Sequence, residues 1–312
     1  MKQIGMMILA ALLLTACGNK ETQLRQRAAE LCQYIPDHEL RETSKDYMTA
    51  EFYAVLDTMF NHLPEHEAMD HEWLYYFVTG NGGTIADYEV TDVKQTDDTH
   101  AIATIEVRQQ WEDGSYAEDS DTEEHQLYME KVDGQWLIAD FDGHKQDCIR
   151  HIEINRKEQA VRKAMSDYLT KEIGSNYLQG QICLPTLLIV AEEDDNKDCT
   201  QVWCDCWVYW YNVAGDTLKT VSGGNHAGCM TIQKKDSHPV VTAFEQTVDG
   251  AGNEASAKRI FGKHYDAFQN MNSNQEVREA ARKEQLQDYV KQHKLDIHYY
   301  QDWGWPAVAL ED

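Results

Sequence analysis

The chain has 312 residues, of which 42% are hydrophobic and only five are proline, so it can bury substantial cores and is long enough for two domains. Its formal net charge of −26 repels nucleic acid and anionic lipid, which argues against a DNA or RNA partner.

The chain opens with the pattern of a secretory signal peptide. Lys2 supplies a positive n-region, and residues 4–16 form an uncharged apolar stretch, shorter than the roughly 20 residues that a membrane-spanning helix needs. The stretch ends in the sequence LTAC at residues 14–17, which resembles the bacterial lipobox. The resemblance implies cleavage before Cys17 and attachment of lipid to its thiol; the alternative is ordinary secretory cleavage beside an incidental cysteine.

The lipobox resemblance implies a protein of the cell envelope whose lipid anchor holds it to a membrane. Gly18 stands where, in some bacteria, an aspartate retains lipoproteins in the inner membrane, so we expect the outer membrane; the leaflet stays open. The predicted organisation is a signal peptide over residues 1–16, a lipidated tether over 17–22, and domains over 23–145 and 156–312.

Helices come first in the mature chain. Apolar residues at helical spacing predict helices over residues 23–32, 52–63 and 73–77. The period then changes from 3.6 to 2, and residues 103–111 alternate like an antiparallel strand with one packed and one solvated face. Asp133-Gly134, between the segments HQLYMEKV and QWLIADF, predicts a tight β-hairpin.

Helices followed by an antiparallel sheet that ends in KVDGQWLIADFDG resemble the nuclear transport factor 2-like superfamily. In that superfamily a curved sheet wraps a long helix and forms a cone with a pocket. The resemblance covers about residues 23–143 and implies a fold rather than a function, because this cone hosts many chemistries and many non-enzymes. Cys32 and Cys148 form a possible disulfide pair in this half.

The same scheme starts again in the second half of the chain. Residues 142–156 hold a glycine and mixed charges and predict a connector, after which a helix face over residues 161–169 ends at Gly174. We expect strands over Ile182–Ala191, Val202–Val213, Thr217–Val221, Gly228–Lys234 and Pro239–Val248, with turns at Gly215-Asp216, Gly223-Gly224 and Asp249-Gly250.

The last segment of the chain predicts another helix. Ser273 and Glu276 form a capping box before a helix that runs to about His293, and residues 295–300 and 301–310 are expected to form a last strand and a packed tail. Because a helix followed by a meander repeats the plan of the first half, we expect a second, divergent cone. The predicted fold class is α+β, with two helix-plus-curved-antiparallel-sheet domains.

The most unusual segment is VWCDCWVYWYN, residues 202–212. Alternate residues of a strand share a face, and one face here carries Trp203, Asp205, Trp207, Tyr209 and Tyr211. Neither face is polar, so we expect both to be covered, one by the first helix of this half and the other by the C-terminal helices. Together with His226, the aromatic face is the candidate pocket of the protein.

A carboxylate on such an apolar face is costly to bury without a partner. Two environments can explain Asp205. A structural partner, either a backbone amide, Lys219 or Arg162, satisfies it, or it borders a wet pocket and awaits a ligand.

Cys204 and Cys206 share the opposite face and could hold one metal ion together with Cys183, Cys229 or His226. A structural zinc site normally shows a second close pair of ligands, and the sequence contains no such pair. Cysteine is also a common small core residue. We therefore expect core packing here, without a metal or another cofactor.

Two further patterns only approach catalytic motifs. His66 and His71 are five residues apart, which would turn their rings roughly 140° apart on a helix, unlike the two histidines of a zincin. Ser222 and His226 lie at an expected strand-to-strand turn, whereas a serine nucleophile needs a strand-to-helix elbow.

Three functions remain open at this point. The favoured one is a lipid-anchored envelope protein that binds a small ligand or an envelope protein without catalysis. The first alternative is a cone-fold isomerase or dehydratase, with Asp205 accepting a proton and Tyr209 or Tyr211 polarising a carbonyl. The second is an envelope assembly or inhibitor subunit, which the duplicated scaffold suggests.

Overall fold

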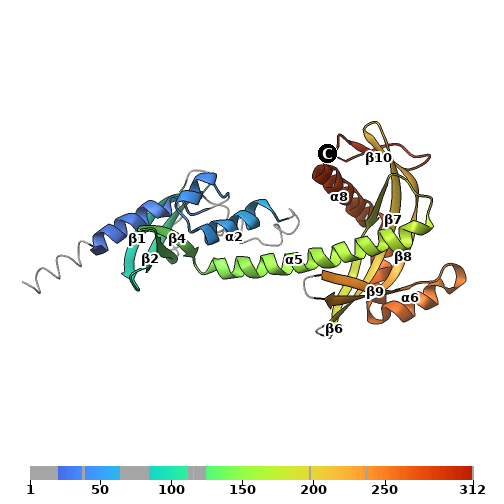
Figure 1. The fold of residues 1–312 in the computed structure, drawn as a ribbon, viewed down its shortest axis with the longest axis horizontal. Helices are drawn as coiled ribbons and strands as arrows, with labels where there is room; N and C mark the ends of the chain where they lie inside the picture. The colour runs from blue at the N-terminus through green and yellow to red at the C-terminus, as the bar shows by residue number, and fades with distance from the viewer. Residues whose placement is uncertain are drawn as a thin grey trace, which may run out of the picture. The chain divides into compact units, whose positions relative to one another are not determined.

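The computed structural model describes residues 20–36, 39–63, 84–111, 115, 124–196, 198–235 and 238–310. These residues belong to two compact units, divided between Ile154 and Asn155 (Figure 1). Each unit combines helices with a largely antiparallel sheet, which confirms the α+β class. The signal peptide, Cys17 and the helix predicted over residues 73–77 lie outside the described residues.

The first unit packs helices against a four-stranded antiparallel meander with the strand order β1-β2-β3-β4. Its elements are a helix over residues 20–32, the 3-10 helix η1 (Glu42–Asp46), α2 (Ala50–Asn61), β1 (Thr84–Gln95), β2 (His100–Gln110), β3 (Glu124–Val132) and β4 (Gln135–Phe141). Thr49 caps α2 by accepting a hydrogen bond from the Phe52 N–H at 3.3 Å. Phe52 and Leu56 of α2 are fully buried with Ile105 of β2 in one core.

The predicted hairpin at Asp133-Gly134 is confirmed. The two residues connect β3 and β4 with φ values of 50° and 85°, the left-handed conformation that a two-residue type I′ turn requires. The proposed disulfide is not formed: Cys32 and Cys148 lie in the same core as free thiols, and burial raises the pKa of each to about 12.

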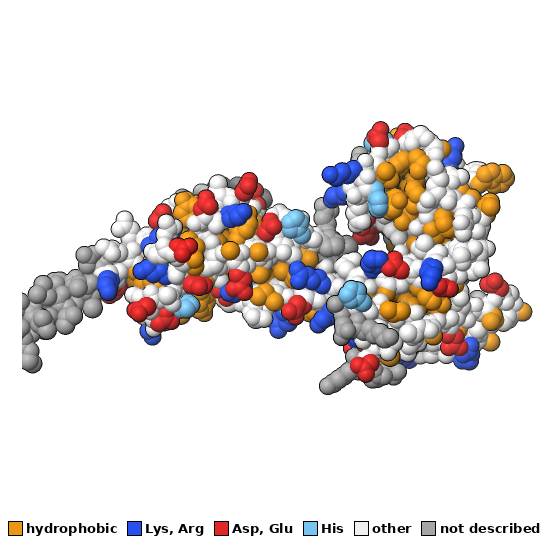
Figure 2. Space-filling view, in the orientation of Figure 1, with side chains coloured by type: hydrophobic (Ala, Val, Ile, Leu, Met, Phe, Trp, Pro, Cys, Tyr) orange, Lys and Arg blue, Asp and Glu red, His pale blue; other side chains and the backbone are white. Residues whose placement is uncertain are grey.

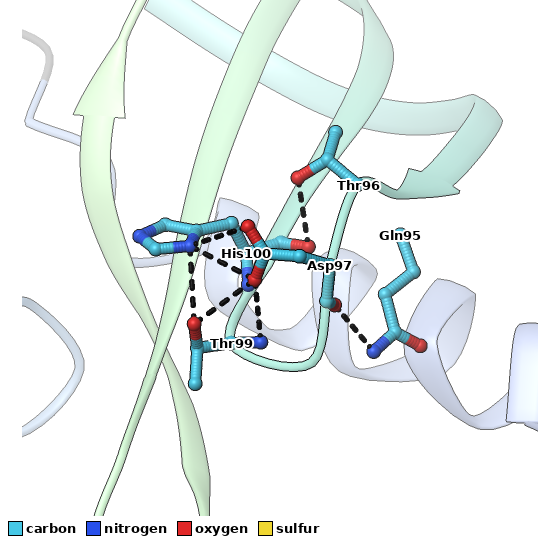
Figure 3. Close-up of polar contacts among 5 residues, drawn as sticks. All are labelled: Gln95, Thr96, Asp97, Thr99 and His100. Carbon is cyan, nitrogen blue, oxygen red and sulfur yellow. Dashed lines mark hydrogen bonds and ion pairs between the residues drawn. The ribbon is translucent and has the colours of Figure 1, made fainter.

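The turn between β1 and β2 is organised around one carboxylate (Figure 3). Asp97 accepts hydrogen bonds from the backbone N–H groups of Thr99 at 2.7 Å and His100 at 2.9 Å, and its oxygens lie 3.0 Å from His100 Nδ1. These contacts, the Thr99 N–H first among them, lower the pKa of Asp97 to about 2. The polar groups of this exposed turn thus satisfy one another, so we assign the turn a structural role.

A single helix replaces the predicted connector, which is therefore wrong. Helix α5 (His144–Tyr168) begins directly after Gly143, which has a φ of 78°, and runs without interruption across the boundary between the units. Its 25 residues contain no glycine or proline, so nothing in the backbone ends the helix where the mixed charges occur. Beyond it the chain continues as the π-helical turn η3 (Leu169–Ile173), and Gly174 keeps a helical φ of −59°.

The second unit is built on a seven-stranded sheet with the order β11-β10-β8-β7-β5; β6 pairs with β7, and β9 pairs with β8. Its remaining elements are η4 (Gly174–Asn176), β5 (Ile182–Thr186), β6 (Ile189–Asn196), β7 (Cys199–Ala214), β8 (Thr217–Lys235), β9 (His238–Gln246), η5 (Gly250–Gly252), α6 (Asn253–Phe261), η6 (Gly262–His264), α7 (Tyr265–Ser273), α8 (Gln275–His293), β10 (Tyr299–Gln301) and β11 (Val308–Ala309).

The predicted turn at Gly223-Gly224 is wrong, because both residues lie inside the long strand β8. Close packing explains these glycines. A side chain at Gly223 would collide with the Val208 carbonyl of the neighbouring strand, and one at Gly224 would collide with the hydroxyl of Tyr177. The expected strand Ile182–Ala191 is in turn divided into β5 and β6.

The C-terminal elements also differ from the prediction. The sequence did not predict α6 and α7. The cap of α8 is Asn274, whose side chain accepts from the Val277 N–H at 3.2 Å, rather than Ser273. The last strand is reduced to the three residues of β10, and only part of the tail is packed: Leu310 is buried, but Trp303 and Trp305 are exposed.

Candidate functional site

The unusual segment forms most of β7, the central strand of the second unit, and both of its faces are covered as predicted. On one face, Cys204, Cys206 and Val208 pack with Val161 and Met165 of α5. The other face meets the C-terminal elements, and its core contacts include Tyr209 and Tyr211 with Leu286 of α8, and Trp203 with Phe261 of α6 and Phe268 of α7.

The aromatic face is tightly packed. Tyr211 is fully buried, Tyr209 is 8% exposed and Asp205 only 1% exposed. The ring of Tyr209 lies between its neighbours, with its centroid 6.0 Å from that of Trp207 and 6.1 Å from that of Tyr211. Burial raises the pKa of Tyr209 to about 12. The candidate pocket residues on this strand therefore fill the interior rather than line an open cavity.

Asp205 has structural partners, but they are not the expected ones. Its carboxylate accepts hydrogen bonds from the side-chain amides of Asn225 on β8 and of Asn272 on α7, the latter at 3.0 Å. Lys219 and Arg162, the charged partners proposed from the sequence, are not the groups that bind it. Both asparagines are exposed, so the carboxylate lies just beneath the surface under two amides.

His226 does not join the aromatic face. Its register partner on β7 is Cys206, so it lies on the face that packs against α5. There its Nε2 is 2.8 Å from the Tyr177 hydroxyl and its Nδ1 is 2.7 Å from Gln246 Oε1. Ser222 donates instead to the carbonyl of Leu178 at 2.6 Å, so serine and histidine form no catalytic pair.

The most heavily bonded side chain of the aromatic face comes from outside the predicted set. Arg282 of α8 is only 1% exposed, and its guanidinium lies 4.0 Å from the ring centroid of Tyr209. It donates to both oxygens of Asp302, at 2.9 and 2.7 Å, to the hydroxyl of Tyr211 at 2.9 Å and to that of Thr220 at 2.8 Å. We call these five residues the Arg282 cluster.

The centre of the Arg282 cluster is an ion pair between Arg282 and Asp302 in which both side chains stay charged. Burial by itself would lower the pKa of Arg282, but the hydrogen bonds to Asp302 and the electrostatic interactions with Tyr211, Asp302 and Tyr209 raise it overall. The same hydrogen bonds hold the pKa of Asp302 below its usual value. Four of the five N–H donors of the guanidinium are thereby used, so the cluster connects α8 and the C-terminal tail to the sheet.

Among the described residues, Trp207 has the one ring of this face whose polar atom is fully buried without a hydrogen-bond partner. Its indole Nε1 and the Oγ1 of Thr186, the register partner of Trp207 on β5, are buried without a hydrogen-bond partner. The guanidinium of Arg278 lies 4.6 Å from the Trp207 ring centroid. This cation–π contact stabilises the ring without satisfying its N–H.

The cysteines behave as core residues. Cys204 and Cys206 are fully buried, and their mutual hydrogen bond, together with burial, holds the pKa of the Cys204 thiol well above its usual value. Metal binding needs thiolates. Within the described parts of the chain, no three His, Cys, Asp or Glu side chains are arranged to hold a metal ion.

An open groove of about 530 Å³ lies in the first unit, whereas the pocket residues suggested by the sequence all belong to the second unit. Its lining comes from the helix over residues 20–32, the η1 segment and the β3–β4 turn: Arg27, Glu30, Asp46, Tyr47, Gly134, Gln135 and Trp136. Arg27 is fixed in it by an ion pair to Glu30 at 2.7 Å and by donating to the Trp136 carbonyl at 3.0 Å. Its guanidinium lies 5.7 Å from the Tyr47 ring centroid.

No protein-family model matches the chain, and no curated protein matches it. Among solved structures it is similar to a protein described as an Ntf2-like protein involved in plasmid conjugation, with a TM-score of 0.21 and 10% sequence identity. The match covers 73% of this chain and 98% of the other. Across the described ranges, no helix is both long enough and apolar enough to cross a membrane.

Proposed function

We propose that the chain is a lipid-anchored protein of the cell envelope that binds a small ligand or a protein partner without catalysing a reaction. The anchor is Cys17, and the support for it is the lipobox pattern that ends the apolar stretch. The same proposal places the protein in the outer membrane, because Gly18 replaces the aspartate that retains some lipoproteins in the inner membrane.

The Cys17→Ser variant is expected to leave the membrane fraction. Several acyl chains, each contributing about 0.8 kcal/mol per buried methylene, hold a lipoprotein firmly, and serine has no thiol to receive them. The measurement is the distribution of wild type and variant between membrane and soluble fractions after a carbonate wash. Variant protein that still sediments with membranes would refute the anchor.

One observation favours binding over catalysis: three groups considered for acid–base chemistry, Asp205, His226 and Tyr211, have internal hydrogen-bond partners. Asp205 accepts from two asparagine amides, and both ring nitrogens of His226 lie within hydrogen-bond distance of other side chains. A general base needs a lone pair directed at its substrate. The buried phenol of Tyr211 is likewise occupied by Arg282.

The groove of the first unit is the place where we expect a ligand to bind. Tyr47 and Trp136 supply ring surface, while Arg27, Glu30 and Asp46 supply charges of both signs. Such a combination binds a ligand through apolar contact and orients it through a few polar groups. Glu30 and the Trp136 carbonyl already hold Arg27 in position, so its side chain would lose little conformational entropy when a ligand binds.

Native mass spectrometry of the purified protein is expected to reveal a bound small molecule that is absent from Trp136→Ala. The substitution removes one wall of the groove. Tyr128→Ala, on the neighbouring strand β3 and outside the groove lining, is the matched control and should keep the ligand. A ligand retained in Trp136→Ala would place the site elsewhere, and no ligand in any form would favour the assembly or inhibitor alternative.

We also propose that both units are cones of the nuclear transport factor 2-like kind. The support is their plan: in each, helices pack on one face of a largely antiparallel sheet, with Phe52 of α2 in the first core and Met165 of α5 in the second. The second unit adds α6, α7 and α8 on the other face, which makes it the divergent copy.

A further inference from the structure

Two tryptophans near the C-terminus are presented to solvent. Trp303 is 94% exposed and Trp305 is 71% exposed, although tryptophan is a large apolar residue that is mostly buried in folded proteins. Hydrophobic side chains reach the surface of the second unit in Figure 2. We call residues 303–305, Trp-Gly-Trp, the tryptophan loop.

The tryptophan loop is held in place on both sides, so its exposure is built into the fold. Before it, the Arg282 cluster fixes Asp302. Across it, the Trp305 N–H donates to the Asp302 carbonyl at 3.1 Å, and Gln301 Nε2 donates to the Trp305 carbonyl at 2.9 Å. Gly304, with a φ of 81°, allows the tight reversal between the two indoles.

The chain after the loop is also tied back to the unit. Val308 and Ala309 pair with β10, and the Leu310 N–H donates to the His298 carbonyl at 2.8 Å. Leu310 is buried, whereas Val308 is 43% exposed and extends the apolar surface beside the loop. The buried Arg282 and the β10–β11 pair thus hold the loop in place, although its two exposed tryptophans contribute little to the core.

The chemistry of the loop identifies what it contacts. Residues 303–310, WGWPAVAL, carry no charged side chain in a chain of which 26% is charged; Asp302, which precedes them, is paired with Arg282, and Glu311 and Asp312 follow them in the sequence. A protein partner is usually oriented by complementary charges, which this loop lacks. Indoles, apolar with one N–H, instead favour the interfacial region of a lipid bilayer.

We propose that the tryptophan loop inserts into the interface of a zwitterionic lipid bilayer. The two indoles enter the headgroup region, where the apolar rings leave water and each N–H still finds an acceptor. Anionic bilayers are disfavoured because the net charge of −26 repels them. The inference adds a second membrane contact to the proposed lipid anchor. It rests on the proposed function for the membrane that the protein meets in the cell, but the loop itself can be tested without the anchor.

The test uses the full mature chain carrying Cys17→Ser, so that no lipid anchor contributes. Flotation with phosphatidylcholine vesicles measures its partitioning. The protein is expected to float with the vesicles, and Trp303→Ala with Trp305→Ala is expected to weaken partitioning by about tenfold or more, since each indole buries a large apolar area. Val248→Ala removes another exposed apolar side chain, 52% exposed and outside the loop, and should not change the partitioning.

Vesicles with brominated acyl chains give an independent readout. They should quench the tryptophan fluorescence of the Cys17→Ser chain but not that of the double tryptophan variant. Because the two indoles lie at the surface, the melting temperature of the variant should equal that of its parent, which separates lost insertion from lost folding.

Three outcomes overturn the proposal, of which two concern phosphatidylcholine vesicles: a parent chain that does not float, or a double variant that floats equally well. Flotation with phosphatidylglycerol vesicles alone would also contradict it, because it would indicate electrostatic attraction. The flotation result does not depend on the lipid anchor, because the chain tested carries Cys17→Ser. The carbonate wash in turn does not depend on the loop, because carbonate removes peripherally bound proteins from membranes but leaves acylated ones in place. Cys17→Ser fractionation therefore tests the anchor separately.

Discussion

Arg282→Met is expected to lower the free energy of unfolding of the second unit by about 3 kcal/mol, near the lower end for breaking a buried ion pair. Methionine keeps most of the side-chain volume but leaves the half-buried Asp302 without its cation. The lower end applies because Asp302 is 39% exposed, so water screens part of its charge. The hydroxyls of Tyr211 and Thr220 lose their donor as well.

Urea unfolding followed by far-UV circular dichroism measures this change. Adding Asp302→Asn to Arg282→Met removes the uncompensated charge and should recover part of the loss, which a pure packing defect would not allow. Lys258→Ala, which removes an exposed ion pair with Glu254 on α6, should leave the free energy of unfolding unchanged within experimental error. Equal losses in Arg282→Met and Lys258→Ala would contradict the assigned role of the Arg282 cluster.

The Arg282 cluster also has a defined acid dependence. Because Arg282 holds the pKa of Asp302 below its unfolded value, the stability that this pair contributes is present above about pH 4 and is lost as the pH falls through the folded pKa. The difference between wild type and Arg282→Met should therefore shrink in strong acid. A difference that stays constant from pH 7 to pH 2 would show that packing, not charge, dominates.

Asp205→Asn is expected to destabilise the second unit by about 1–3 kcal/mol. The carboxylate accepts from the amides of Asn225 and Asn272, and an asparagine at this position offers one acceptor oxygen and one N–H₂ group. One of the two donors would then face another donor in a buried position. The contact between α7 and β7 that Asn272 provides should be weakened with it.

Thermal melts of wild type and Asp205→Asn at pH 7 distinguish the two explanations of this carboxylate. Asp288→Asn, at an exposed position of α8, is the control and should melt like wild type. A higher melting temperature in Asp205→Asn would mean that the charge is kept at a cost to stability. That result would favour a ligand-binding or catalytic carboxylate beneath the two exposed amides and would revive the enzyme alternative.

The sequence predicted correctly those structural elements that are determined by a few neighbouring residues. The Asp133-Gly134 hairpin and the two covered faces of β7 follow from turn chemistry and a period of two. Gly223 misled the prediction because glycine serves both turns and close packing, and the packing partner, Val208, lies on another strand. The mixed charges of α5 likewise resembled a linker, although no helix-breaking residue is present.

The candidate site depended on contacts between distant parts of the sequence. Asp205 was singled out correctly as a buried carboxylate, but its partner Asn272 is 67 residues away, and no short-range pattern connects them. Arg282 did leave a signal: it lies on the stripe that continues to Leu286 and Val290 at intervals of four, where an apolar residue is expected. Its partner Asp302 lay in a segment expected only to pack as a tail.

Helix α5 makes the two units difficult to separate. Its first half buries Cys148 and Ile152 in the core of the first unit, and its second half buries Val161 and Met165 in that of the second. Proteolysis within the exposed stretch between them would shorten a core helix of both units, whereas cleavage of an ordinary linker shortens neither. A gene rearrangement that exchanged one unit would meet the same obstacle, so we expect the two units to be inherited together.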